Sequence, residues 1–306
     1  MPPPAFASAA PLRPRIVEGE RVLLLADEPE RVAASGVLYS DVVAGPFRVF
    51  AYTLADAGPM RLRILATADR PTTVRLERAG AGGPGAGFFQ VGRAALEGWL
   101  HGRAPRQALT AGPRPADLLP ALSAAAAARG QAVNGVLDAT ADGPVRVTVR
   151  AEVGGAARDA VVPPGPRPAG VPMRGTFACA DVSLAAEDCV PGTALRLAHI
   201  PSYLTGHSAV DERAVVNYGN YGVGYRITLR APQGGAQSSV VFVPLGGGFC
   251  GSMRLQDRAV ALAAPGGRQL DAYQGLHLGA LSPAAPWTIE WMPPAASYLS
   301  VALMFV

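Results

Sequence analysis

The sequence contains no lysine, and charged residues make up only 16% of its 306 positions. All 27 basic residues are arginines, against 23 acidic residues, which gives a formal net charge of +4. The arginines are scattered, and in their densest stretch, residues 61–78, they alternate with apolar residues. Alternation of this kind is typical of the solvated face of strands rather than of a surface that follows a phosphate backbone. The composition therefore argues against nucleic-acid binding.

Long apolar runs are also missing. No stretch reaches about 18 apolar residues, so we predict no transmembrane helix and no membrane insertion. The N-terminus has neither the basic region nor the apolar core of a signal peptide, although its small residues from Ala5 to Ala10 resemble the sequence around a signal-peptidase site. Residues 1–14 are therefore either the start of a mature secreted chain or an ordinary disordered tail.

Cysteine is scarce, with three residues and no CxxC pair. The four histidines do not share ligand spacing with the cysteines, so we predict neither a metal site nor a cofactor. Cys179 and Cys189 flank a segment that we interpret as a turn, which predicts a short-range disulfide and an oxidising compartment. The alternative is two small buried thiols that never meet. Cys250 is expected to be a buried free thiol.

Glycine and proline are abundant, with 36 and 29 residues and no fixed period, which excludes collagen and favours a fold with many turns. Several segments have the apolar character of strands, most of them with apolar residues at every second position, as in a strand with one buried face. These segments are 23–25, 37–39, 47–52, 60–65, 73–77, 130–140, 144–153, 224–230, 238–244, 286–291 and 297–306. The C-terminus itself is thus expected to be a core strand, so that its removal would unfold this part of the protein.

Turn signals separate some of these strands. Ala44-Gly45-Pro46 and Ala141-Asp142-Gly143 both predict a reversal of the chain, and the Asp-Gly pair is the best hairpin signal in the sequence. A partial helical face predicts a helix near residues 90–102, and an alanine run at 122–129 predicts a second, shorter one. Because helices do not alternate with strands, a doubly wound α/β fold is disfavoured.

The segment 161–170 is rich in proline and glycine and suits neither a helix nor the middle of a sheet. It predicts a linker between two tandem antiparallel β-sandwich-like domains. The first comprises residues 15–160 with one or two short helices packed on it, and the second comprises residues 171–306. The predicted fold class is accordingly mainly β.

Three short motifs suggest chemistry, and each has a simpler interpretation. Residues 80–85 match the GxGxxG of dinucleotide-binding loops, but Pro84 removes a backbone donor and no parallel βαβ unit surrounds it. Residues 248–252 look like the GxCG sequence around the nucleophile of chymotrypsin-like viral cysteine proteases, and a glycine-rich turn explains them better. His207, Ser208 and Asp211 lie too close in sequence to form a converging triad readily. A hydrolase around Cys250 or His207 is therefore the least favoured hypothesis.

The most distinctive segment is 217–225, with the sequence NYGNYGVGY. Aromatic rings interleaved with amides supply flat apolar area and paired donors and acceptors, as a sugar- or peptide-binding face requires. The simpler interpretation is a series of turns, in which Asn and Gly take positive φ and Tyr packs at the edge of a sandwich. The candidate binding residues are Asn217, Tyr218, Asn220, Tyr221, Tyr225 and His207.

One resemblance covers most of the chain loosely. It rests on the segments 48–52, 61–65, 74–76, 80–85, 90–93, 99–100, 174–177 and 220–226. These resemble segments of uncharacterised secreted β-rich two-domain proteins of spore-forming Gram-positive bacteria, some of them described as copper-amine-oxidase-N-like. The resemblance implies an extracellular β protein, favours the mature secreted N-terminus and supplies no catalytic residue.

These observations together predict a non-catalytic structural or interaction protein that is secreted or lies at the cell surface. The alternative is a carbohydrate- or peptidoglycan-binding module that uses the region from Tyr218 to Tyr225. The expected partners are cell-wall glycan or other surface proteins. An exposed row of tyrosine rings would favour the binding module over a purely structural role.

Overall fold

The computed structural model describes residues 8–27, 31–102, 107–163, 173–197, 202–235 and 237–306. Strands account for 55% of the protein and helices for 8%, so the mainly-β prediction is confirmed. The strands form three sheets, and most of the pairs are antiparallel. Within the described residues, two α-helices, α2 (Phe88–His101) and α3 (Pro120–Ser123), and a 3-10 turn, η1 (Pro265–Gly267), accompany them.

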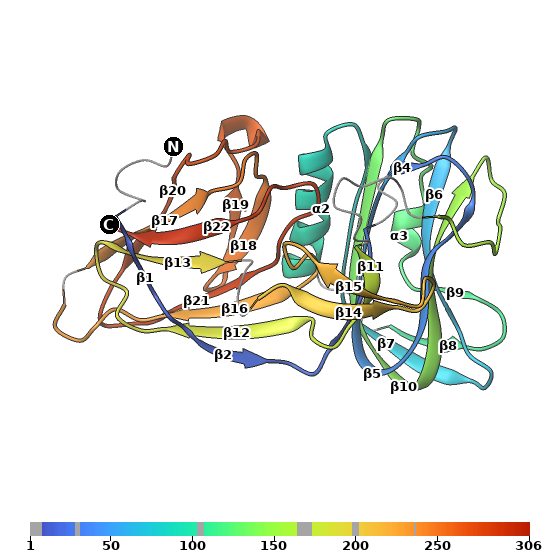
Figure 1. Cartoon of the computed structure of the whole chain (residues 1–306), viewed down its shortest axis with the longest axis horizontal. Helices are drawn as coiled ribbons and strands as arrows, with labels where there is room; N and C mark the ends of the chain where they lie inside the picture. Colours follow the sequence, from blue (N-terminus) through green and yellow to red (C-terminus); the bar gives the residue numbers. More distant parts are fainter. Residues whose placement is uncertain (1–7, 28–30, 103–106, 164–172, 198–201, 236) are drawn as a thin grey trace.

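Two of the sheets form a sandwich, on the left in Figure 1. The five-stranded sheet has the order β1 (Ala10–Pro11), β13 (Thr193–Leu197), β22 (Val301–Phe305), β17 (Ser238–Pro244) and β20 (Leu276–Leu281). The six-stranded sheet has the order β19 (Arg258–Leu262), β18 (Gly251–Leu255), β21 (Trp287–Trp291), β16 (Gly224–Leu229), β12 (Asp181–Ala186) and β2 (Arg15–Glu18). Side chains of both sheets, such as Phe242, Phe305, Ile227 and Trp291, share one core.

The third sheet has eleven strands and lies on the right in Figure 1. Its main path is β15 (Arg213–Asn217), β14 (Leu204–Ser208), β11 (Arg174–Phe177), β3 (Val22–Ala26), β5 (Gly36–Ala55), β10 (Ala132–Val153), β6 (Met60–Thr67) and β9 (Ala116–Asp117). Beside this path, β4 (Arg31–Val32) pairs with β5, and β7 (Thr72–Gly85) pairs with β10 and with β8 (Ala108–Ala111). A second core, which includes Val49, Ile64 and Val147, belongs to this sheet.

The helix predicted near 90–102 is α2, which stands between the two β regions (Figure 1). Its buried residues Val91, Ala95 and Trp99 recur every four positions and so lie on one face. The glycines of the GxGxxG sequence lie in β7 against this face. A Cβ added at Gly80 or Gly82 would overlap helix carbonyl oxygens, so these glycines serve close packing between strand and helix.

The two predicted turns at 44–46 and 141–143 are wrong. β5 and β10 each continue through the turn sequence, and they pair antiparallel from Ala132↔Leu54 to Ala151↔Gly36. The ladder changes register between Ala141 and Val145, and Gly45 has a φ of 73°. Glycine and proline therefore mark an irregularity inside two long strands here, which is the other structure that such residues favour.

The sheets also do not divide at the predicted linker, of which residues 164–170 lie outside the described residues. β1 pairs with β13 and β2 pairs with β12, so the N-terminal segment joins the C-terminal sandwich. Conversely, β11 pairs with β3 in the eleven-stranded sheet. The boundaries 15–160 and 171–306 therefore do not separate the strands, and the expected tail 1–14 includes a strand, although residues 1–7 lie outside the description. The composition of a segment does not show which distant strands pair, because that pairing depends on tertiary contacts.

The predicted disulfide between Cys179 and Cys189 is wrong, because both cysteines are free and buried, as is Cys250. The segment between them is not a turn but contains strand β12, of six residues. A strand of that length spans roughly 20 Å at about 3.3 Å per residue. Two Cα atoms need to lie within about 7 Å for a disulfide, so the extended strand keeps these thiols apart.

Candidate functional site

The segment 217–225 forms the connection from β15 to β16, and its backbone follows the turn interpretation. Gly219 and Gly222 have φ values of 101° and 77°, and Asn220 has a φ of 52°. The Asn217 side chain closes the turn, because its Oδ1 accepts a hydrogen bond from the Tyr221 N–H at 3.0 Å and its Nδ2 donates to the Tyr221 carbonyl at 2.8 Å. Asn and Gly thus supply the left-handed positions that this connection requires.

The side-chain amides of Asn217 and Asn220 form hydrogen bonds with other groups of the protein. Asn220 is fully buried. Its Oδ1 accepts from the Leu204 N–H at 2.9 Å, and its Nδ2 donates to the Ser202 carbonyl at 2.9 Å and to the Tyr225 hydroxyl at 3.1 Å. Tyr225 is itself buried, and burial raises the pKa of its phenol. Of the predicted binding residues, Asn217, Asn220 and Tyr225 therefore hold the turns in place.

The tyrosines Tyr218 and Tyr221 instead reach an open cleft of about 390 Å³, which we call the aromatic cleft. The cleft is lined by Asp27, Arg31, Tyr52, Leu54, Phe88, Met173, Tyr218, Tyr221, Ala296, Ser297 and Tyr298. Tyr218, Tyr298 and Phe88 are 43%, 61% and 38% exposed. Tyr203, also exposed, packs edge-on against Tyr218 with 5.3 Å between ring centroids. Every exposed large aromatic side chain in the described part of the chain thus lines this cleft or, in the case of Tyr203, packs against a ring that does.

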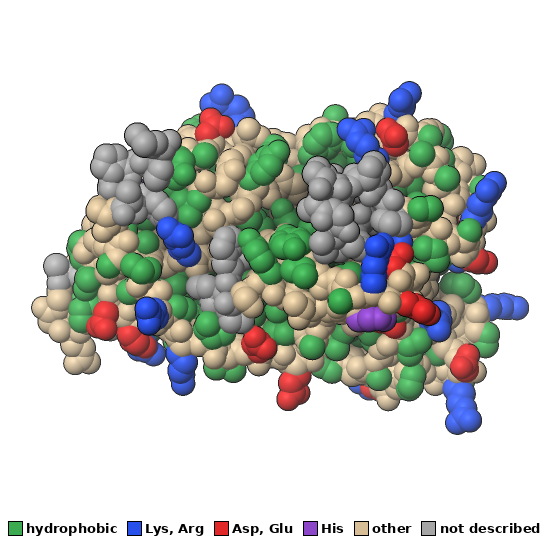
Figure 2. Space-filling view, in the orientation of Figure 1, with side chains coloured by type: hydrophobic (Ala, Val, Ile, Leu, Met, Phe, Trp, Pro, Cys, Tyr) green, Lys and Arg blue, Asp and Glu red, His purple; other side chains and the backbone are tan. Residues whose placement is uncertain are grey.

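The walls of the aromatic cleft come from both β regions. Asp27 and Tyr52 belong to the end of β3 and to β5, Phe88 opens α2, and Tyr298 precedes β22. Hydrophobic side chains gather near the middle of the face shown in Figure 2, in the region where β15 ends and β22 begins. Strands from the two halves of the sequence pair within the same sheets, and this pairing brings the rings of Tyr52, Phe88 and Tyr298 to one cleft.

The tyrosine rings at this wall differ in their contacts and exposure. The Tyr221 hydroxyl donates to the Ser297 carbonyl at 2.8 Å, and its ring packs against Phe50 with 6.5 Å between centroids. Tyr221 is thus held as a rigid wall, whereas the rings of Tyr218 and Tyr298 project further into solvent. A flat surface of this kind suits the apolar face of a ring-shaped ligand.

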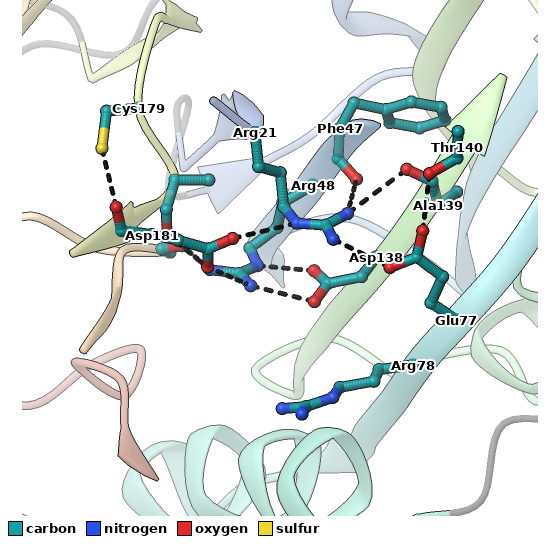
Figure 3. Close-up of polar contacts among 12 residues, drawn as sticks. Arg21, Phe47, Arg48, Glu77, Arg78, Asp138, Ala139, Thr140, Cys179 and Asp181 are labelled. Atoms are coloured by element: carbon teal, nitrogen blue, oxygen red, sulfur yellow. Dashed lines mark hydrogen bonds and ion pairs between the residues drawn. The ribbon is translucent and has the colours of Figure 1, made fainter. Parts of the chain in front are cut away.

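A separate cluster of charged side chains, which we call the arginine junction, lies between the eleven-stranded sheet and β12 (Figure 3). Its centre is Arg48 of β5, which is 1% exposed. Arg48 forms two hydrogen bonds to Asp138 of β10, at 2.6 and 2.9 Å, and one to Asp181 at 2.8 Å. Its Nη1 donates to the carbonyls of Ala180 and Gly222 at 2.6 and 3.1 Å. One side chain thus connects strands from both halves of the sequence.

The positive charge of Arg48 stabilises the ionised form of the Asp138 carboxylate. Burial alone would raise the pKa of Asp138, but the charge of Arg48 and its hydrogen bonds outweigh burial, and the pKa lies below its usual value. The guanidinium groups of Arg48 and Arg78 both lie over the Trp99 ring, at 4.6 and 5.2 Å from its centroid. Arg21 extends the cluster, with bonds to Asp181 at 3.0 Å and to Glu77 at 2.8 Å.

The arginine junction is not among the sites predicted from the sequence. Its signal was present, because Arg48 and Asp138 are charged residues within segments that otherwise have a buried apolar character. They are direct cross-strand partners in the β5–β10 ladder, a placement that favours an ion pair. Recognising this required the pairing of two segments about 90 positions apart, which one sequence does not supply.

The remaining predicted residues lie elsewhere. His207 is exposed on β14, opposite Thr176 and Ala214, and does not line the aromatic cleft. Burial raises the pKa of the Cys250 thiol, which is unlike the lowered pKa of an activated nucleophile. Among the residues that the structure describes, no three His, Cys, Asp or Glu side chains gather as a metal site would require.

Comparison of the chain with models of known protein families finds no match, and comparison with curated proteins finds no similar sequence. Within the described ranges, none of the helices has the length and apolar character needed to span a bilayer.

Proposed function

We propose that this protein is a non-catalytic carbohydrate-binding protein of the cell surface or exterior, and that the aromatic cleft holds the ligand. The observation that carries the proposal is the collection of three exposed rings, Phe88, Tyr218 and Tyr298, at one cleft. The exposed ring of Tyr203 packs against Tyr218. Exposed aromatic rings are costly in water, and their concentration at one concave surface favours a binding role over a purely structural one.

The chemistry of the cleft suits a sugar. Tyrosine rings cover the apolar C–H faces of a pyranose, and polar groups at the rim bind its hydroxyls. The lining includes the buried carboxylate of Asp27 and the exposed guanidinium of Arg31, which also pairs with Asp56 at 3.4 Å. The volume of about 390 Å³ suits a ligand of one or two rings. The resemblance to secreted proteins of Gram-positive bacteria supports an extracellular role and makes cell-wall glycan the first ligand to test.

The test is binding to purified peptidoglycan and to an array of soluble oligosaccharides, with wild-type protein and with Tyr218→Ala and Tyr298→Ala. Each variant should lose about tenfold in affinity for the same glycan, because each removes one stacking surface. Val42→Ala is the matched control, since Val42 is 47% exposed on β5 and does not line the cleft. Absence of glycan binding by the wild-type protein, or equal binding by all variants, would return the protein to a structural role.

A further inference from the structure

A second open pocket, of about 300 Å³, lies over the arginine junction, and the aromatic cleft does not account for it. Its lining includes Arg21, Arg78, Trp99, Ser183, Arg226 and Glu290. Four of these six side chains are charged. The pocket is therefore polar, unlike the aromatic cleft, and calls for a different ligand.

Positive charge is in excess at one end of this pocket. Arg78 donates to Glu290 at 3.1 Å, and Arg254 pairs with the same carboxylate. Arg226 lies directly opposite Glu290 in the β16–β21 ladder and forms no ion pair among the described residues. Two guanidinium groups thus contact the Glu290 carboxylate, and Arg226, whose side chain is exposed, lies at the strand position opposite it.

At the other end of the pocket, the arginines already form ion pairs with carboxylates. There Arg21 and Arg48 meet the carboxylates of Glu77, Asp138 and Asp181 through the bonds described above. Three carboxylates against two guanidinium groups leave this end slightly negative. The charge balance therefore favours an anion at the Arg226 end of the pocket rather than at the Arg48 end.

We propose that this pocket binds the oxyanion of a small ligand, a carboxylate or a phosphate group, at Arg226 and Arg78. The planar guanidinium presents paired N–H donors that match two oxygens of such a group. Ser183, the exposed cross-strand neighbour of Arg226, places a hydroxyl beside the same position. Bound oxyanion offsets the local excess of positive charge without displacing Glu290 from its two arginines.

The test is titration with inorganic phosphate and, separately, with acetate, followed by NMR shifts of the Trp and Arg side chains, at constant ionic strength maintained with chloride. Saturable shifts with either oxyanion are expected, and the identity of the better ligand distinguishes phosphate from carboxylate. Arg226→Gln should weaken binding by about tenfold or more, because it removes a charged hydrogen-bond donor.

Arg230→Gln is the matched control, since Arg230 is also exposed, lies just beyond the same strand and pairs with Glu187 at 3.5 Å. It should leave binding unchanged. Equal losses in both variants, or shifts that chloride reproduces, would mean general screening and would overturn the proposal. Tyr218→Ala should retain oxyanion binding, which keeps this result separate from that of the glycan test.

Discussion

At the scale of single residues, Arg48 is one of two arginines, with Arg174, that are almost completely buried among the described side chains. It is almost fully buried, yet hydrogen bonds to Asp138, Asp181 and two main-chain carbonyls satisfy its guanidinium. A buried charge is tolerated only when such partners replace the water that it loses. The partners lie on β10, on β12 and in the segments just before β12 and β16, so this residue depends on a correctly assembled tertiary structure.

We predict that Arg48→Met lowers the free energy of unfolding by about 3–5 kcal/mol, because it leaves Asp138 buried without its partner. The control is Arg75→Gln. Arg75 also makes two bonds to one carboxylate, Asp142, but this pair is 57% and 43% exposed. Its loss should cost less than about 1 kcal/mol. Urea unfolding of both variants provides the comparison, and equal costs would contradict the role assigned to Arg48.

At the scale of elements, the contact between α2 and β7 depends on small residues. Gly80 and Gly82 of the strand face the helix backbone, and Gly98 of the helix faces Gly80. These glycines let the two backbones approach more closely than any side chain would allow. Because α2 also contacts β10 and β18, its position affects both β regions.

Gly82→Ala should therefore destabilise the protein by about 1–3 kcal/mol, because its Cβ would overlap the carbonyl oxygen of Val91 and force the helix away. Gly112→Ala is the matched control, since a Cβ at Gly112 meets no atom within 4 Å. It should be neutral or slightly stabilising. Thermal unfolding of the two variants measures the difference, and a neutral Gly82→Ala would show that the helix adjusts freely.

At the scale of the whole molecule, the two halves of the sequence share sheets. β1 and β2 complete the C-terminal sandwich, and β11 with its neighbours extends the eleven-stranded sheet. One core includes Phe50 and Trp99 from the first half together with Trp291 and Phe305 from the second. Separation of the halves would expose this apolar surface to water.

We predict that the protein unfolds in a single calorimetric transition, with equal calorimetric and van 't Hoff enthalpies. Shared strands and a shared core couple the halves, so neither is stable after the other has unfolded. Arg48→Met should move the whole transition to lower temperature without splitting it. Two separate transitions in the wild-type protein would show that the halves fold independently.

The sequence predicted local structure well where burial alone decides it. The period-two segments 60–65, 73–77 and 224–230 lie in β6, β7 and β16, and the helix near 90–102 is α2. The sequence-based prediction is wrong where the same residue types favour two different structures. Gly45 and Gly143 suit a turn or an irregular strand, and only the full pairing of β5 with β10 selects the second.

The candidate sites divide in the same way. Tyr218 and Tyr221 were selected from their own segment, whereas Phe88, Tyr298 and Asp27 joined them only through folding. Alternating burial along the chain is a local property, so the sequence by itself determined the β class, the helix α2 and the turns at 217–225. Which strands pair, where charges meet and where rings converge are relations between distant segments, so only the tertiary structure decided the shared sheets, the arginine junction and the aromatic cleft.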